Sequence, residues 1–183
     1  MQQSELHGVL IELCSYSGEG DQVLRHLARE ISKFIEILAI SSIYRVKKQE
    51  TGTMGIHDLR SFEVSSGLMA VIKGTTEKSP EDILLLFEQT ELKMRSEMMH
   101  KSVALSLLTY DGATRMTPTL TLPHVNLHMQ QATLVMASEV WGDYFHPVLR
   151  ESLNSLAQQS SATGWGEFYS QGKTLLDFYP PAT

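Results

Sequence analysis

The sequence predicts an α+β fold of the ferredoxin-like type, in which an antiparallel sheet carries two helices on one face. Two observations lead to this prediction. Stretches with the apolar pattern of strands are separated by two segments in which apolar residues recur at helical spacing. The order of these stretches is strand, helix, strand, strand, helix, strand, which is the βαββαβ order of that fold.

The first half of the pattern lies in residues 7–46. Residues 7–16, HGVLIELCSY, are rich in strand formers, and Asp21 in the following turn is placed to cap a helix. Apolar residues then recur every three or four positions, which predicts a helix over 21–34 with one buried face. The segment 35–46 returns to strand character.

The second half begins after a polar stretch at 47–60, which has two glycines and no apolar period and is expected to be a long exposed loop. A strand is predicted over 62–74. Ser79 and Pro80 then suit the start of a helix over 80–93. A strand over 102–110 completes the core, and the Asp-Gly pair at 111–112 is a hairpin signal.

Additional C-terminal helices are predicted over 132–141 and 146–158. The tail from Ser160 contains glycines and prolines and is expected to be irregular. The domain organisation that follows is one domain over 1–158 and a C-terminal extension over 159–183.

Composition excludes several classes of function. The net charge of −6 argues against a protein that coats nucleic acid or an anionic membrane. The single cysteine, Cys14, cannot form an internal disulfide, and no stretch approaches the roughly 18 apolar residues of a membrane span. We therefore expect a cytoplasmic protein without a nucleic-acid or membrane partner.

Three short strings carry a family resemblance. They are SSIYRV at 41–46, SPEDIL at 79–84 and LTLPH at 120–124. Their order and spacing resemble the 6-hydroxymethyl-7,8-dihydropterin pyrophosphokinase (HPPK) family of folate biosynthesis, over roughly residues 7–158. The resemblance implies transfer of diphosphate from ATP to the pterin, with magnesium ions between the enzyme and ATP.

The positions that the resemblance assigns to metal binding carry no carboxylate. The family places two aspartates on the strand that matches KSVALSLL, and Ala104 and Ser106 stand at those positions. A methyl group cannot bind magnesium, and a neutral hydroxyl is a poor replacement for a carboxylate. Asp111 is roughly 17 Å further along a strand, at about 3.3 Å per residue, and is better explained as a turn residue.

The positions that the resemblance assigns to the pterin are also altered. The family's asparagine is replaced by Val64, Ser65 or Ser66, depending on a small gap. An ungapped match places Gln130 at an arginine position and Ala132 at the position of the phenylalanine that stacks on the pterin. Loss of that ring would weaken a pterin site.

Some candidate phosphate contacts remain by resemblance. Arg95 and Lys101 could meet nucleotide phosphate, although a solvated cationic loop explains them as well. His124 matches a histidine near nucleotide phosphate, or it is a loop histidine bonded to backbone. His124 and His128 have the spacing of a metal pair on a helix, but no third ligand is evident, so no metal site is expected.

Three functional hypotheses follow. The chain is a catalytically inactive relative of HPPK with a binding or interaction role, an active pyrophosphokinase with a rearranged site, or a binding module for an unrelated small molecule or protein. Losses at the metal, pterin and phosphate positions together favour the first and third hypotheses. No cofactor is expected, and magnesium and ATP enter only if the family activity is retained.

Overall fold

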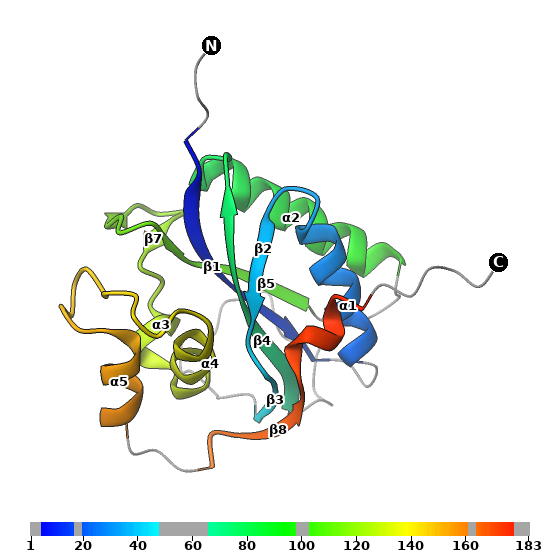
Figure 1. The fold of residues 1–183 in the computed structure, drawn as a ribbon. Helices are drawn as coiled ribbons and strands as arrows, with labels where there is room; N and C mark the ends of the chain where they lie inside the picture. The colour runs from blue at the N-terminus through cyan, green and yellow to red at the C-terminus, as the bar shows by residue number, and fades with distance from the viewer. Residues whose placement is uncertain (1–4, 17–19, 48–65, 98–102, 161–163, 178–183) are drawn as a thin grey trace.

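A computed structural model of the chain describes residues 5–16, 20–47, 66–97, 103–160 and 164–177. Its centre is an antiparallel sheet of strand order β5-β1-β4-β3-β8, with β2 also paired to β4 (Figure 1). The strands are β1 (His7–Ser15), β2 (Glu36–Ile40), β3 (Ile43–Lys47), β4 (Ser66–Thr76), β5 (Val103–Tyr110) and β8 (Gly166–Ser170).

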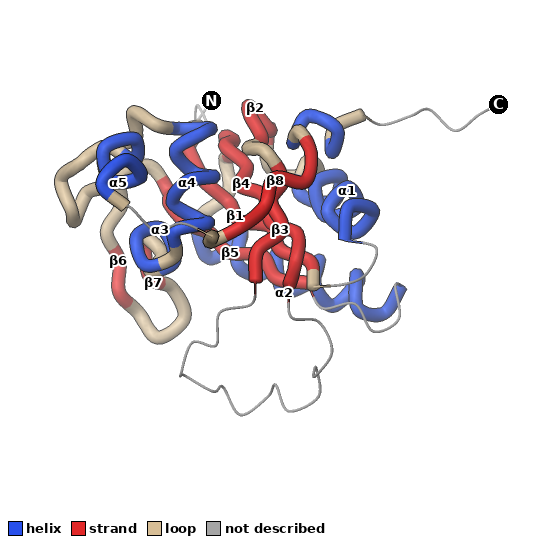
Figure 2. Tube along the Cα trace, turned by 90° about the horizontal axis from the view of Figure 1, so that it is seen from below, coloured by secondary structure: helices blue, strands red, loops and turns tan. Residues whose placement is uncertain are grey.

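Two helices cover one face of this sheet, as Figure 2 shows from below. Helix α1 (Gly20–Ile31) buries Leu24, Leu27 and Ile31, and helix α2 (Pro80–Glu97) buries Ile83 and Phe87, in one apolar core with alternate strand residues. The spacing of these residues places them on one side of each helix, which is why the helices form against the sheet. The predicted ferredoxin-like α+β fold is confirmed.

The other face is partly covered by the later helices. These are α3 (Asn126–Met129), α4 (Gln131–Trp141) and α5 (Leu153–Gln159). Leu134 and Met136 of α4 pack with Leu10, Val71 and Leu108 of the sheet in a second core cluster. The described helices include none that is both long and apolar enough to cross a bilayer.

The predicted strand over 35–46 is divided in two. At the break, the Ser41 N–H donates to the Val71 carbonyl at 2.9 Å, and the Ser41 hydroxyl accepts from the Val71 N–H at 2.9 Å. A side chain here takes the place of a backbone carbonyl in the ladder, so the strand is interrupted without leaving a donor unpaired. The helix predicted over 80–93 continues to Glu97.

Two C-terminal predictions were wrong. Residues 146–152 are not helical, because Ser152 caps α5 by accepting from the Ser155 N–H at 3.2 Å and the helix starts at Leu153. The tail is not irregular over 166–175, because β8 pairs with the outer edge of β3 and η1 (Gly172–Leu175) follows it. The domain boundary at 158 stays a prediction.

The prediction of a hairpin at Asp111 and Gly112 was also wrong. The strand that precedes it, β5, pairs with β1, while β6 (Arg115–Met116) pairs with β7 (Thr121–Leu122). Asp111 is nevertheless a turn residue, with φ of 47°. Its carboxylate accepts from the Gly8 N–H at 2.7 Å and so ties the turn to β1.

Candidate functional site

The two positions matched to the family's metal ligands lie on β5, at the edge of the sheet. Val103 and Leu107 of this strand are buried in the core beneath α1 and α2. Ala104 and Ser106 point to the opposite face, where Ala104 is exposed and Ser106 is half-buried. These two residues therefore do not lie beneath α1 and α2.

A carboxyl group lies beside Ser106. Glu12 of β1 is the direct cross-strand partner of Ser106, so the two side chains share a face. Glu12 is only 5% exposed; the Thr133 hydroxyl lies against one carboxyl oxygen, and the Asn126 amide donates to the other at 3.5 Å. Burial raises the pKa of Glu12, and these hydrogen bonds oppose the rise only in part.

The hydroxyl of Thr133 lies between Glu12 and Gln130. The hydroxyl of Thr133 lies against both Glu12 Oε2 and the side-chain oxygen of Gln130, the latter at 3.3 Å. A hydroxyl has one proton to donate. That proton is donated to Glu12 Oε2, which is why this contact lowers the pKa of Glu12 and opposes the effect of burial.

A second carboxyl group holds the outer edge of β5. Glu91 of α2 accepts from the backbone N–H of Leu105 at 2.8 Å and lies 3.4 Å from the guanidinium of Arg95. Burial raises the pKa of Glu91, while the Leu105 hydrogen bond and the charge of Arg95 oppose it. Arg95 is therefore close to the matched metal strand, but its charge is already paired with Glu91.

His124 lies on the same edge of β5. Its backbone N–H donates to the Leu108 carbonyl at 2.8 Å, and its ring Nδ1 accepts from the backbone N–H of Asn126 at 3.2 Å. Burial lowers the pKa of His124. With Nδ1 accepting, a neutral ring carries its proton on Nε2, which is a donor suited to an anion or a carbonyl oxygen.

The remaining predicted site residues lie at the start of α4 or outside the described part of the chain. Ala132 is 5% exposed and packs in the second core cluster. Gln130 is half-buried at the start of α4 and is held by Thr133. Val64, Ser65 and Lys101 lie outside the described residues.

Sequence reasoning missed Glu12 and Glu91. Glu12 is a single charged residue within the strand sequence VLIELC, and that interruption of an apolar run was the available signal. Glu91 lies within the helix predicted over 80–93, and its bond to Leu105 could not be predicted because it depends on how α2 lies against β5.

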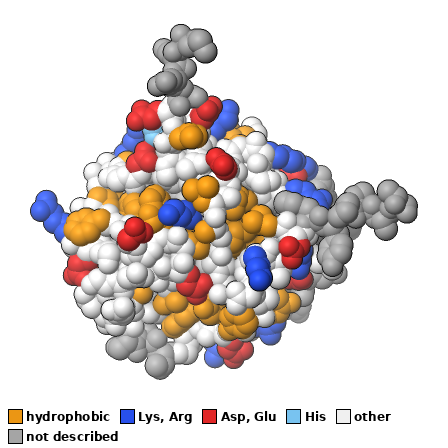
Figure 3. Space-filling view, viewed as in Figure 1, with side chains coloured by type: hydrophobic (Ala, Val, Ile, Leu, Met, Phe, Trp, Pro, Cys, Tyr) orange, Lys and Arg blue, Asp and Glu red, His pale blue; other side chains and the backbone are white. Residues whose placement is uncertain are grey.

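The face that carries α4 is mainly apolar. Figure 3 shows apolar side chains gathered over the middle of the sheet, with acidic side chains scattered singly around them. No group of three or more metal-ligating side chains occurs within the described ranges. The donor set of this face does not fit a dinuclear magnesium site.

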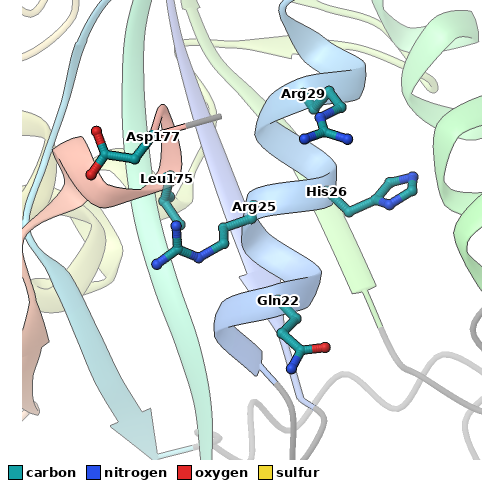
Figure 4. Close-up of a pocket in the computed structure, with 6 residues that line it drawn as sticks. All are labelled: Gln22, Arg25, His26, Arg29, Leu175 and Asp177. Carbon is teal, nitrogen blue, oxygen red and sulfur yellow. The ribbon is translucent and has the colours of Figure 1, made fainter. Parts of the chain in front are cut away.

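A separate cavity of about 180 Å³ lies on the helical side, between α1 and η1. Its polar lining includes Gln22, Arg25, His26 and Arg29, and these side chains spread apart rather than converge (Figure 4). Arg25 also donates to the Thr174 carbonyl. The arrangement attaches the C-terminal segment to α1.

Solved structures similar to this chain are HPPK-DHPS proteins of Plasmodium falciparum. A triple mutant with pteroate has a TM-score of 0.68 and 11% identity, over 86% of this chain and 44% of that chain. The wild type with pterin and p-hydroxybenzoate has a TM-score of 0.64 and 11% identity, over 87% of this chain and 44% of that chain. This chain thus spans less than half the length of those proteins.

No protein-family model and no curated protein sequence matches the chain. The structural likeness therefore stands on the arrangement of helices and strands, which extends over most of the described residues. At this level of identity it establishes the fold alone: the chain has an HPPK-like fold.

Proposed function

We propose that this chain is an HPPK-like protein without pyrophosphokinase activity, in which a binding or interaction role replaces catalysis. The observation that carries the proposal is the chemistry at the matched metal positions. Ala104 offers a methyl group, Ser106 a neutral hydroxyl, and the adjacent Glu12 is buried and hydrogen-bonded.

The reaction of the family needs anionic oxygen ligands on the protein. Transfer of a phosphoryl-type group depends on metal ions fixed against the phosphates. Burial raises the pKa of Glu12 and so disfavours its charged form, and Glu91 is already bonded to Leu105 and Arg95. Magnesium that is bound only to ATP in solution lacks this fixed position, so the chemical step is not accelerated.

The alternative is an active enzyme with a rearranged site, and Glu12 is the residue that would support it. Its carboxyl group lies beside Ser106, where an ionised side chain could approach a cation. Ionisation of Glu12 would have to overcome its burial, which raises the pKa of this carboxyl group. This alternative therefore predicts activity that depends on Glu12.

The remaining parts of the proposal concern partners and location. A net charge of −6 disfavours nucleic acid, which leaves a small molecule or a protein as the partner. A cytoplasmic location is consistent with a single, buried cysteine.

The test is to incubate purified protein with ATP, magnesium and 6-hydroxymethyl-7,8-dihydropterin and to follow AMP formation. We expect no AMP above the no-protein control, with a catalytically active HPPK as the positive control. Turnover in the wild type that is lost in Glu12→Gln would establish the rearranged site and refute the proposal.

A further inference from the structure

His146 lies at the centre of a tight turn between α4 and α5. Its backbone N–H donates to the Glu151 carbonyl at 2.8 Å, and its backbone carbonyl accepts from the Arg150 N–H at 2.8 Å. The turn is closed by a bridge between Phe145 and Ser152. His146 is 0% exposed, although its neighbour Phe145 is 60% exposed.

The side chain of His146 caps this turn from within. Its ring Nδ1 accepts from the N–H groups of Val148 at 3.3 Å and Leu149 at 3.1 Å. These are the second and third residues after His146, which is the hydrogen-bond pattern of a helix cap normally supplied by Ser, Asp or Asn. Unlike Asn or Ser, histidine loses its acceptor when it is protonated near neutral pH.

We propose that His146 is an acid-sensitive lock of the 145–152 turn, closed when Nδ1 accepts the two N–H groups and opened when a proton occupies Nδ1. Protonation places an N–H donor against two backbone N–H donors, so the ring can no longer cap the turn. The backbone also carries strain here, because Arg150 has φ of 58°. When the cap is released, the backbone of Arg150 can leave the left-handed region of φ and ψ.

The surroundings of the ring oppose protonation in the closed state. With Nδ1 accepting, the proton of the neutral ring is on Nε2, which is buried and has no hydrogen-bond partner among the described residues. The ring of His128 of α3 lies edge-on, with centroids 5.4 Å apart. Burial first, and then the charge of His128, lower the pKa of His146.

The charged groups of the turn itself are directed elsewhere. Arg150 is exposed, and the carboxylate of Glu151 accepts from the Ser155 hydroxyl at 2.8 Å and the Gln159 amide at 2.5 Å. No carboxylate is therefore described against the imidazole that could stabilise its charged form. A histidine whose pKa is lowered on folding destabilises the closed turn as the pH falls below the ordinary histidine value of about 6.5.

The test compares hydrogen exchange of the 145–152 segment with that of α5 in the same full-length molecule at pH 7.5 and pH 5. The ratio of the two segments cancels the effect of pH on intrinsic exchange. We expect protection of the turn relative to α5 to fall at least tenfold at pH 5 in the wild type. The ring ¹⁵N signals of His146 should show an unprotonated Nδ1 at pH 7.5. They should titrate with the same pH midpoint as the loss of protection of the 145–152 segment.

Two variants separate the lock from a merely structural role. His146→Asn places a non-titrating oxygen near the Nδ1 position and should keep the turn protected at both pH values, whereas His146→Ala should leave it unprotected at both. His128→Gln removes the neighbouring charge and should raise the midpoint. The proposal would be overturned if the turn lost protection equally at pH 5 in the wild type and in His146→Asn. It would also be overturned if the wild-type turn stayed protected while the His146 ring titrated.

Discussion

Glu12 is a carboxyl group placed where the sheet and α4 leave it almost no water. It contacts Thr133 and Asn126, which belong to α4 and α3, so its burial is produced by residues far away in the chain. The sequence shows only a charged residue in an apolar strand. Its protonation state could not be predicted, since that depends on which helix later covers the strand.

Replacing Glu12 with Gln should change how stability depends on pH. A carboxyl group whose pKa is raised in the folded state contributes stability that is present at acid pH and is lost as the pH rises towards the folded pKa. Glu12→Gln should therefore gain stability relative to the wild type between pH 5 and pH 8, by about 1.4 kcal/mol for each unit of pKa shift. Urea unfolding at the two pH values measures this difference.

Glu36→Gln is the matched control, because it makes the same chemical change at an exposed position on β2. It measures what the same substitution does to stability where the side chain is exposed. If the difference in stability between Glu12→Gln and the wild type did not change between pH 5 and pH 8, the raised pKa of Glu12 would be contradicted.

At the scale of elements, the prediction was accurate where the signal is local. The core strands and both long helices follow from apolar periodicity and from the Ser79 cap, which accepts from the Asp82 N–H at 3.2 Å. It was wrong for β8, whose sequence GEFYS lies among glycines and is a strand only because β3 offers it an unpaired edge. Such pairing depends on partners far apart in sequence.

The attachment of η1 to the sheet requires a glycine at position 172. A Cβ there would lie 1.8 Å from the Ser41 carbonyl oxygen and 2.8 Å from Cγ2 of Ile40. Gly172→Ala should therefore destabilise the protein by about 1–3 kcal/mol, because backbone at this contact cannot move aside cheaply. Thermal or urea unfolding gives the value.

Gly112→Ala serves as the control for that substitution. A Cβ at Gly112 meets nothing within 4 Å, so the change should stay within about 0.5 kcal/mol of the wild type. Equal stability of Gly172→Ala and Gly112→Ala would show that η1 is not held closely against β2.

For the whole molecule, the fold was predictable and the site was only half predictable. The resemblance assigned Ala104 and Ser106 to one strand of the core, and the structure places both on the face of β5 away from α1 and α2. It did not find the pair of Arg95 with Glu91, because the predicted helix ended at residue 93, whereas α2 continues to Glu97 and places the two residues four apart on one helix. It also did not find that Glu91 accepts from the Leu105 N–H, a contact made between α2 and the edge of β5. Sequence patterns describe elements, whereas a site is made where several elements meet.

Restoring the two carboxylates tests whether the scaffold still accommodates a nucleotide. Ala104→Asp with Ser106→Asp should produce magnesium-dependent ATP binding, measured by calorimetry, because two adjacent anionic ligands then face solvent. Turnover should stay near background, because Gln130 and Ala132 are unchanged. ATP binding that does not depend on magnesium, or efficient turnover, would contradict this expectation.

The position of β8 also bears on the order in which the chain folds. Its partner β3 lies in the first third of the sequence, whereas β8 is near the C-terminus. During synthesis, the βαββαβ core and α4 emerge long before the strand that completes the sheet. Contacts so distant in sequence form slowly, so the outer edge of β3 remains unpaired in a nascent chain until residues 166–170 have left the ribosome.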